Sequence, residues 1–139
     1  IKMLKIRKKY FVDLGCGTGR AVNFFYNRGY KKIIGVEQSK KIFEICSNLK
    51  VSKKIILINK DVKKYHIPDN TGIIYIYNPG PSDLIKKIIN KIKKKNFKNL
   101  IVIYVTPKYI KLFNKKNFEI IKKDYNKNFV GYVILKFLR

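Results

Sequence analysis

Three glycines on alternate positions, Gly15, Gly17 and Gly19, follow an apolar run that carries Asp13 near its end. Glycine reaches positive φ without a steric penalty and, lacking Cβ, lets a ligand touch the backbone itself. The run therefore predicts a strand that ends in a ligand-binding loop. A carboxylate beside this loop attracts a cation and repels a pyrophosphate. The third glycine also comes one residue too early for the dinucleotide pattern G-x-G-x-x-G, which argues against a nicotinamide-dependent oxidoreductase.

Further acidic residues follow the next two apolar runs. Glu37 ends the run at 33–36 and lies 22 positions beyond Gly15. An acid about 20 residues after a glycine loop, at the end of the second strand, is where an acceptor for ribose hydroxyls belongs in such folds. The alternative is an ordinary solvated carboxylate at a strand end. A third apolar run, 55–58, leads into Asp61.

The segment from Asp13 to Gly19, D-x-G-x-G-x-G, resembles motif I of the class I S-adenosylmethionine-dependent methyltransferases. The resemblance implies that the cofactor is S-adenosyl-L-methionine, a zwitterion with a sulfonium cation, and that Asp13 and the glycine loop hold its methionine end. It also implies that Glu37 binds the ribose and that the Asp61 carboxylate accepts from the adenine amine. The remaining implied cofactor-binding residues are Cys16 in the loop, Gln38 beside the nucleoside, Val62 next to Asp61, and Asn78.

A fourth apolar run, 72–77, leads directly into Asn78, Pro79, Gly80 and Pro81. This stretch resembles the N-P-P-[YFW] tetrapeptide of methyltransferases that act on planar nitrogens, where the Asn side chain and a proline carbonyl accept from the target amine. The resemblance implies that Asn78 and Pro79 are catalytic. Gly80 and Pro81 depart from the pattern, so the stacking aromatic is missing unless a tyrosine at 75, 77 or 104 replaces it. The alternative is a plain turn, since Pro and Gly punctuate loops generally.

The order of the predicted elements agrees with this family. Apolar periodicity predicts helices over 20–28, 40–49 and 83–95, with Ser39 and Ser82 as N-caps of the last two. Further strands are expected over 100–105, 118–125 and 129–137, with a short helix over 109–114. The prediction is an α/β, Rossmann-like class I methyltransferase fold: a mostly parallel seven-stranded sheet, helices on both faces and a C-terminal antiparallel hairpin. Residues 1–139 are expected to form one S-adenosylmethionine-binding domain with a short or missing N-terminal lid.

The charge balance is strongly basic, with 33 Lys and Arg against 8 Asp and Glu and a net charge of +25. Such an excess favours a polyanion, so nucleic acid is a possible partner and a non-catalytic basic module that binds RNA, DNA or an acidic protein is the alternative function. The competing interpretation is compositional, since only four of these residues are Arg. Two cysteines without metal-ligand spacing fit a reducing, cytoplasmic setting, and the sequence predicts neither a metal site nor a membrane span. The methyl acceptor is not identifiable from the sequence.

Overall fold

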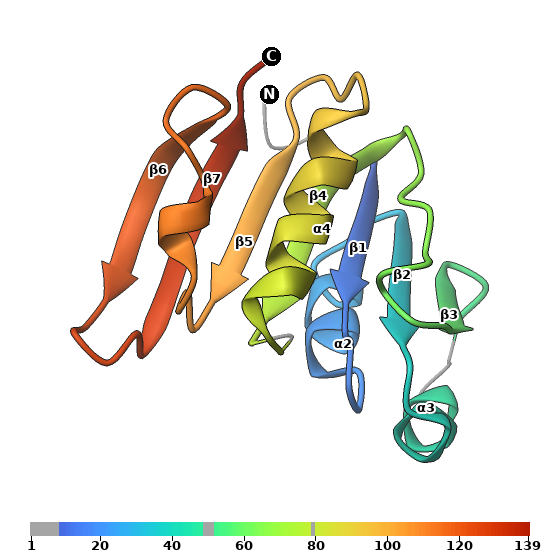
Figure 1. Ribbon diagram of the computed structural model, residues 1–139. Helices are drawn as coiled ribbons and strands as arrows, with labels where there is room; N and C mark the ends of the chain where they lie inside the picture. Colours follow the sequence, from blue (N-terminus) through green and yellow to red (C-terminus); the bar gives the residue numbers. More distant parts are fainter. Residues whose placement is uncertain (1–8, 49–51, 79) are drawn as a thin grey trace.

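A seven-stranded sheet forms the centre of the computed structural model, which describes residues 9–48, 52–78 and 80–139 (Figure 1). The strand order is β3-β2-β1-β4-β5-β7-β6. Strands β1 to β5 are parallel to one another, whereas β7 is antiparallel to both β5 and β6. The strand bounds are β1 (Tyr10–Leu14), β2 (Lys32–Glu37), β3 (Ile55–Asn59), β4 (Thr71–Tyr77), β5 (Ile101–Val105), β6 (Phe118–Tyr125) and β7 (Gly131–Phe137).

The strand order reverses direction between β1 and β4. The chain builds β1, β2 and β3 outward in one direction, then returns to place β4 and β5 on the other side of β1. Ligands of open α/β sheets bind in the crevice that opens outside the carboxyl ends of the strands at such a point. The loops after β1, β2, β3 and β4 all leave from this edge, so the fold brings the predicted site residues to one place.

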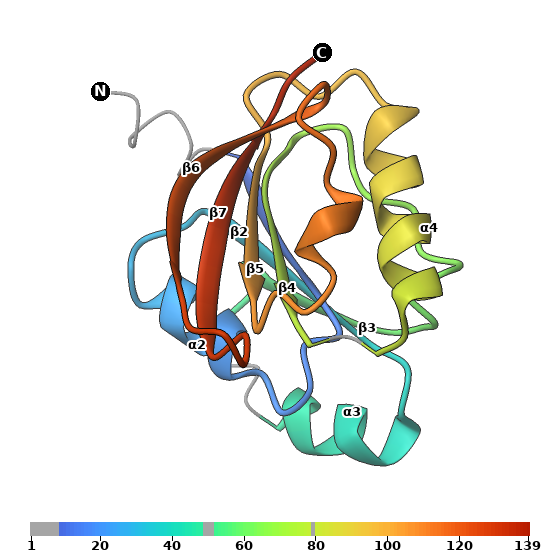
Figure 2. The same cartoon turned by 60° about the vertical axis from the view of Figure 1, so that its left-hand side comes forward.

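Helices cover the two faces of the sheet unequally (Figure 2). Helix α4 (Ser82–Lys93) packs on one face, while α2 (Arg20–Tyr26) lies on the other. Helix α3 (Lys40–Ser47) follows β2, and a short 3-10 helix, η1 (Ile110–Leu112), follows β5. Alternate residues of β1 supply both cores, because successive side chains of a strand point to opposite faces: Phe11 belongs to the α2 core and Val12 to the α4 core.

The predicted fold class is confirmed, and the differences from the predicted elements are local. Helix α2 ends at Tyr26 rather than at residue 28. Ser82 is the first residue of α4 and not its N-cap; Pro81 takes the cap position and no side chain caps the helix. The predicted cap of α3 is correct, since the Ser39 hydroxyl accepts from the Ile42 N–H at 3.4 Å. The predicted short helix over 109–114 is a single 3-10 turn. The expected end of the second helix, at 49, lies outside the described residues.

Candidate cofactor site

Two adjoining cavities lie at the carboxyl edge of the sheet, on either side of the glycine loop, and Gly15 and Tyr77 line both. The first, of about 350 Å³, is lined by Asp13, Gly15, Cys16, Gly17, Thr18, Arg20, Ala21, Tyr75 and Tyr77. The second, of about 280 Å³, is lined by Gly15, Glu37, Gln38, Asp61, Val62, Lys63, Tyr77, Asn78, Pro81 and Leu84. Together they form an elongated site across the switch point of the sheet.

The glycine loop has the backbone that its composition predicts. Gly15 and Gly17 have φ values of +86° and +53°, and a Cβ added to either would meet nothing within 4 Å. Glycine is therefore required at these two positions by the backbone conformation and not by close packing. The open space beside them leaves room for a ligand. The N–H groups of Gly15 and Cys16 both donate to the Val36 carbonyl, at 2.8 and 2.9 Å, which fixes the loop against β2.

Asp13 is a buried carboxylate at the floor of the first cavity. Its side chain is 2% exposed, and Oδ1 accepts no hydrogen bond from any residue that the structure describes. Burial, reinforced by the negative charge of Glu37, raises the pKa of Asp13 to about 8. A buried and unpaired carboxyl oxygen is unfavourable unless a donor or a cation meets it. The geometry therefore suits a cationic group brought by a ligand.

Glu37 braces the glycine loop from the end of β2. One carboxylate oxygen, Oε2, accepts from the Gly17 N–H at 3.0 Å, and the other, Oε1, accepts from the Ser39 N–H at 2.8 Å. The side chain is 8% exposed and lines the second cavity. Each carboxylate oxygen has two lone pairs, so both can accept a second hydrogen bond while keeping the first. Glu37 thus orders the loop and still presents acceptor capacity to the cavity.

The turn after β3 forms the opposite wall of the second cavity. Asp61 Oδ1 accepts from the Lys63 N–H at 2.8 Å, and the Asp61 carbonyl accepts from the N–H groups of Lys64 and Tyr65 at 2.9 and 3.1 Å. Val62 is buried in the α4 core. This single turn holds one carboxylate oxygen in place and leaves the other available to a donor.

The end of β4 carries the residues expected nearest the chemistry. Asn78 has a left-handed φ of 36°, and its N–H donates to the Val105 carbonyl at 3.3 Å. Asn78 lines the second cavity, whereas Pro79 lies outside the described residues. Of the three candidate tyrosines, Tyr77 is 56% exposed and lines both cavities, and Tyr75 lines the first. Tyr104 is buried, and its hydroxyl accepts from the Tyr109 N–H, so it cannot replace the missing aromatic.

All but one of the described residues predicted for the site line these cavities. The exception is Gly19, which has a φ of 87° and occupies the N-cap position of α2. The cavities are also lined by five residues that were not predicted from the sequence: Thr18, Arg20, Ala21, Lys63 and Leu84. Thr18 lies within the glycine loop, and Arg20 and Ala21 directly follow it, so their nearness in sequence was an available signal. Leu84 enters from α4, and nothing in the sequence pairs it with the turn after β3.

The residues that the structure describes include neither a candidate metal-binding cluster nor a helix suited to cross a membrane. No group of three or more His, Cys, Asp or Glu side chains is placed to hold a metal ion. Within the same residues, no helix is long and apolar enough to cross a membrane.

Comparison with known proteins agrees with this geometry. The family model described as methyltransferase domain matches residues 12–74, which include the glycine loop, Glu37 and Asp61. A structure from Clostridium thermocellum, provisionally named an rRNA methylase, superposes with a TM-score of 0.74 at 13% identity, covering 99% of this chain and 93% of that one. A protein of Escherichia coli named provisionally as a methyltransferase gives a TM-score of 0.76 at 13% identity, covering 95% and 78%. A TehB-like S-adenosylmethionine-dependent methyltransferase of Corynebacterium glutamicum gives 0.70 at 12% identity, covering 94% and 80%.

These likenesses define the class. The chain has the class I methyltransferase fold, and the family match over its first half together with the structural neighbours supports an S-adenosylmethionine-dependent methyltransferase. The family match covers residues 12–74, and the structural neighbours, at 12–13% identity, show the fold over nearly the whole chain. The individual residue roles remain predictions, and the acceptor remains open.

Proposed function

We propose that this protein is an S-adenosyl-L-methionine-dependent methyltransferase whose acceptor is a nitrogen carried by a nucleic acid. The observation that carries the first half of the proposal is the buried Asp13 carboxyl group, whose Oδ1 accepts no hydrogen bond from the described residues and which lines a cavity together with Gly15 and Gly17. A ligand with a cationic amino acid end is the simplest group that would satisfy it.

The two cavities fit the two ends of this cofactor. In the first, Asp13 and the open backbone of Gly15 and Gly17 would receive the methionine end. In the second, Glu37 would accept from the ribose hydroxyls and Asp61 from the adenine amine. Because Gly15 and Tyr77 border both cavities, a ligand spanning them passes directly over the glycine loop.

Bound S-adenosylmethionine supplies a methyl group already activated by its sulfonium, so the protein has only to align an acceptor with it. Positioning alone can lower such a barrier by several kcal/mol, without a dedicated base. Asn78, at the end of β4, would accept from the target amine and orient its lone pair. Tyr77, exposed beside it, supplies the aromatic face that the N-P-G-P stretch lacks.

The surface charge supports a polyanionic acceptor. Three of the eight acidic residues of the chain, Asp13, Glu37 and Asp61, line the cavities. Five acidic residues are therefore not among those that line the cavities, against 31 of the 33 Lys and Arg, since only Arg20 and Lys63 line them among the residues that the structure describes. A surface this basic attracts nucleic acid through phosphate contacts and counterion release, and an exposed tyrosine at the cavity mouth offers a base a stacking partner. The Clostridium thermocellum relative named for rRNA is consistent with this acceptor.

The test separates cofactor binding from catalysis. Calorimetric titration of the wild-type protein with S-adenosylmethionine, and separately with NAD, should show binding of the former alone. Glu37→Ala should weaken this binding, since it removes the ribose acceptor and the brace on Gly17. Asn78→Ala should weaken binding less than Glu37→Ala does, and should reduce methyl transfer to an RNA or DNA pool by more than the change in binding explains. An equal loss of binding in both variants would refute this division of roles.

A methylation assay with tritiated cofactor identifies the acceptor class. Nucleic acid, protein and small-metabolite fractions from a cell extract would be offered in parallel, and label should appear in nucleic acid. Label in the protein fraction alone would refute the proposal that nucleic acid is the acceptor. Cofactor-independent, salt-sensitive binding of RNA, with no binding of S-adenosylmethionine, would instead favour a non-catalytic basic module.

A further inference from the structure

Lys91 of helix α4 reaches across to the turn that walls the second cavity. Its ammonium donates to the carbonyl oxygen of Val62 at 2.8 Å and to that of Tyr65 at 2.6 Å. Burial lowers the pKa of Lys91, while the negative charge of Asp61 acts in the opposite direction. The ammonium is therefore partly removed from solvent, bonded to two main-chain carbonyls and within electrostatic reach of Asp61.

The turn that Lys91 contacts has little regular structure of its own. Between β3 and β4 the structure describes residues 60–70 as a connection without helix or strand. Val62 and Tyr65 anchor this connection in the α4 core through their side chains. The Val62 carbonyl also accepts from the Tyr65 N–H at 3.3 Å, so Lys91 is its second donor, while Lys91 is a donor to the Tyr65 carbonyl as well. A lysine, with three donors on one flexible stem, can serve both carbonyls at once.

We propose that Lys91 is a positioning residue that fixes Asp61 and Val62 against the adenine of the cofactor, and so sets the preference of the site for adenine. The inference rests on the proposed function and extends it to a residue distant in sequence from the glycine loop. With Lys91 in place, the Asp61 carboxylate stays at a fixed distance from the adenine amine. Without it, the turn keeps its internal hydrogen bonds but loses its two bonds to α4, so it can move as a unit relative to the cavity, and the hydrogen bond that would distinguish adenine from other bases weakens.

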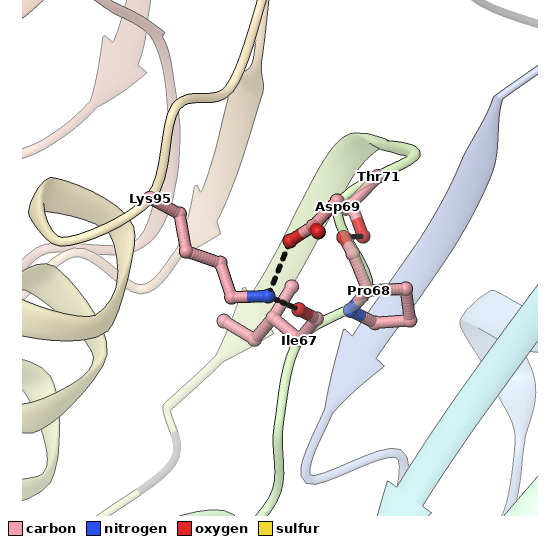
Figure 3. A network of polar contacts seen from close by, with 5 residues as sticks. All are labelled: Ile67, Pro68, Asp69, Thr71 and Lys95. Atoms are coloured by element: carbon pink, nitrogen blue, oxygen red, sulfur yellow. Dashed lines mark hydrogen bonds and ion pairs between the residues drawn. The ribbon is translucent and has the colours of Figure 1, made fainter.

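Lys95, one helical turn further along, offers a matched control (Figure 3). Its ammonium contacts the carbonyl of Ile67 and donates to Asp69 Oδ1 at 2.6 Å. Figure 3 shows this contact beside the bond from the Thr71 hydroxyl to the Pro68 carbonyl, at the end of the connection that enters β4. Lys95 thus holds the same connection with the same chemistry, but Ile67 and Asp69 line neither cavity of the cofactor site.

The experiment compares two ligands in three proteins. S-adenosylhomocysteine and its inosine analogue, in which a carbonyl replaces the adenine amine, would be titrated calorimetrically into wild type, Lys91→Met and Lys95→Met. Wild type should prefer the adenine ligand by about tenfold or more, the discrimination expected of one hydrogen bond to a charged group. In Lys91→Met the adenine ligand should bind about tenfold more weakly, and the preference should fall to within about threefold. Lys95→Met should keep the wild-type affinity for the adenine ligand and the wild-type preference for it. Its unfolding temperature should nevertheless fall by about as much as that of Lys91→Met.

The outcomes separate the two proposals. If wild type binds S-adenosylhomocysteine and Lys91→Met keeps the wild-type preference for adenine, the role of Lys91 is refuted while the proposed function stands. If Lys95→Met loses the preference to the same extent, Lys91 has only a general structural role and the inference also fails. If wild type does not bind S-adenosylhomocysteine, the proposed function and this inference fall together. Should Lys91→Met not fold, the same test is made with Lys91→Gln, which removes the charge and shortens the side chain while keeping an amide NH2 group, and the ratio of its affinities for the adenine and inosine ligands is compared with that of the wild type.

Discussion

Raising the pH from 6 to 7.5 should tighten binding of S-adenosylhomocysteine by about 25-fold, because Asp13 must lose a proton before it can pair with the ammonium of the ligand. The carboxyl pKa of about 8 in the free protein means that Asp13 is largely neutral at pH 7. A cationic ligand favours the ionised form, so binding and deprotonation are linked. Below the pKa, each unit of pH then adds a factor of about ten to the affinity.

The magnitude follows from the ionised fraction. With a pKa of about 8, roughly 1% of Asp13 is ionised at pH 6 and about 24% at pH 7.5. The ratio of these two ionised fractions corresponds to about 1.9 kcal/mol of binding free energy. The sign is that of an acid whose pKa falls when a cation binds: affinity rises with pH up to the pKa of the free protein. Keeping below pH 7.5 limits the contribution of the ligand amine, which loses its own charge at higher pH.

Isothermal titration in buffers of different ionisation enthalpy would measure both the affinity and the protons released. About 0.9 proton should be released per ligand bound at pH 7. Asp13→Asn should bind weakly, release no proton from this site and show a flat profile. His66→Gln is the matched control: it removes the single histidine of the chain, an exposed residue, and should retain the wild-type slope. A wild-type affinity that is constant from pH 6 to 7.5, or a slope that persists in Asp13→Asn, would refute the reasoning.

Two predictions concern stability. Folding raises the pKa of Asp13 from 3.8 to about 8, so the folded state loses stability as the pH rises between these values, by about 4 kcal/mol at pH 7. Asp13→Asn should therefore flatten the fall in the urea-unfolding free energy between pH 4 and 8. An unchanged pH profile would show that Asp13 ionises freely in the folded protein. Gly35→Ala should lower the unfolding free energy by about 1–3 kcal/mol, because the added Cβ would lie 2.9 Å from the Cys16 Sγ and 3.1 Å from the Val22 Cγ2. The variant should also weaken cofactor binding, because it displaces Cys16 in the glycine loop. Wild-type stability and affinity in this variant would mean that the loop adapts without loss.

The local signals in this chain were strong enough to predict the fold. Short apolar runs rich in β-branched residues, such as 33–36 and 73–76, favour buried strands, and helical periodicity identified α4 as amphipathic. The glycine loop was equally predictable, because glycine adopts positive φ without help from tertiary contacts, as Gly15 and Gly17 do. Helix ends were less certain: Ser82 is a good N-cap by type, yet Pro81 takes that position because the chain leaving β4 enters the helix one residue earlier.

What the sequence determined by itself is the order of the elements and the types of group that reach the carboxyl edge of the sheet. Only tertiary structure decided which of those groups share a cavity and how they are partnered. It buried Tyr104 and left Tyr77 at the mouth of the site, directed both oxygens of Glu37 to backbone amides, and placed Lys91 on the carbonyls of Val62 and Tyr65. Contacts between residues 20 to 30 positions apart depend on strand register and helix packing, which are set cooperatively by the whole core, so no local pattern of residues encodes them.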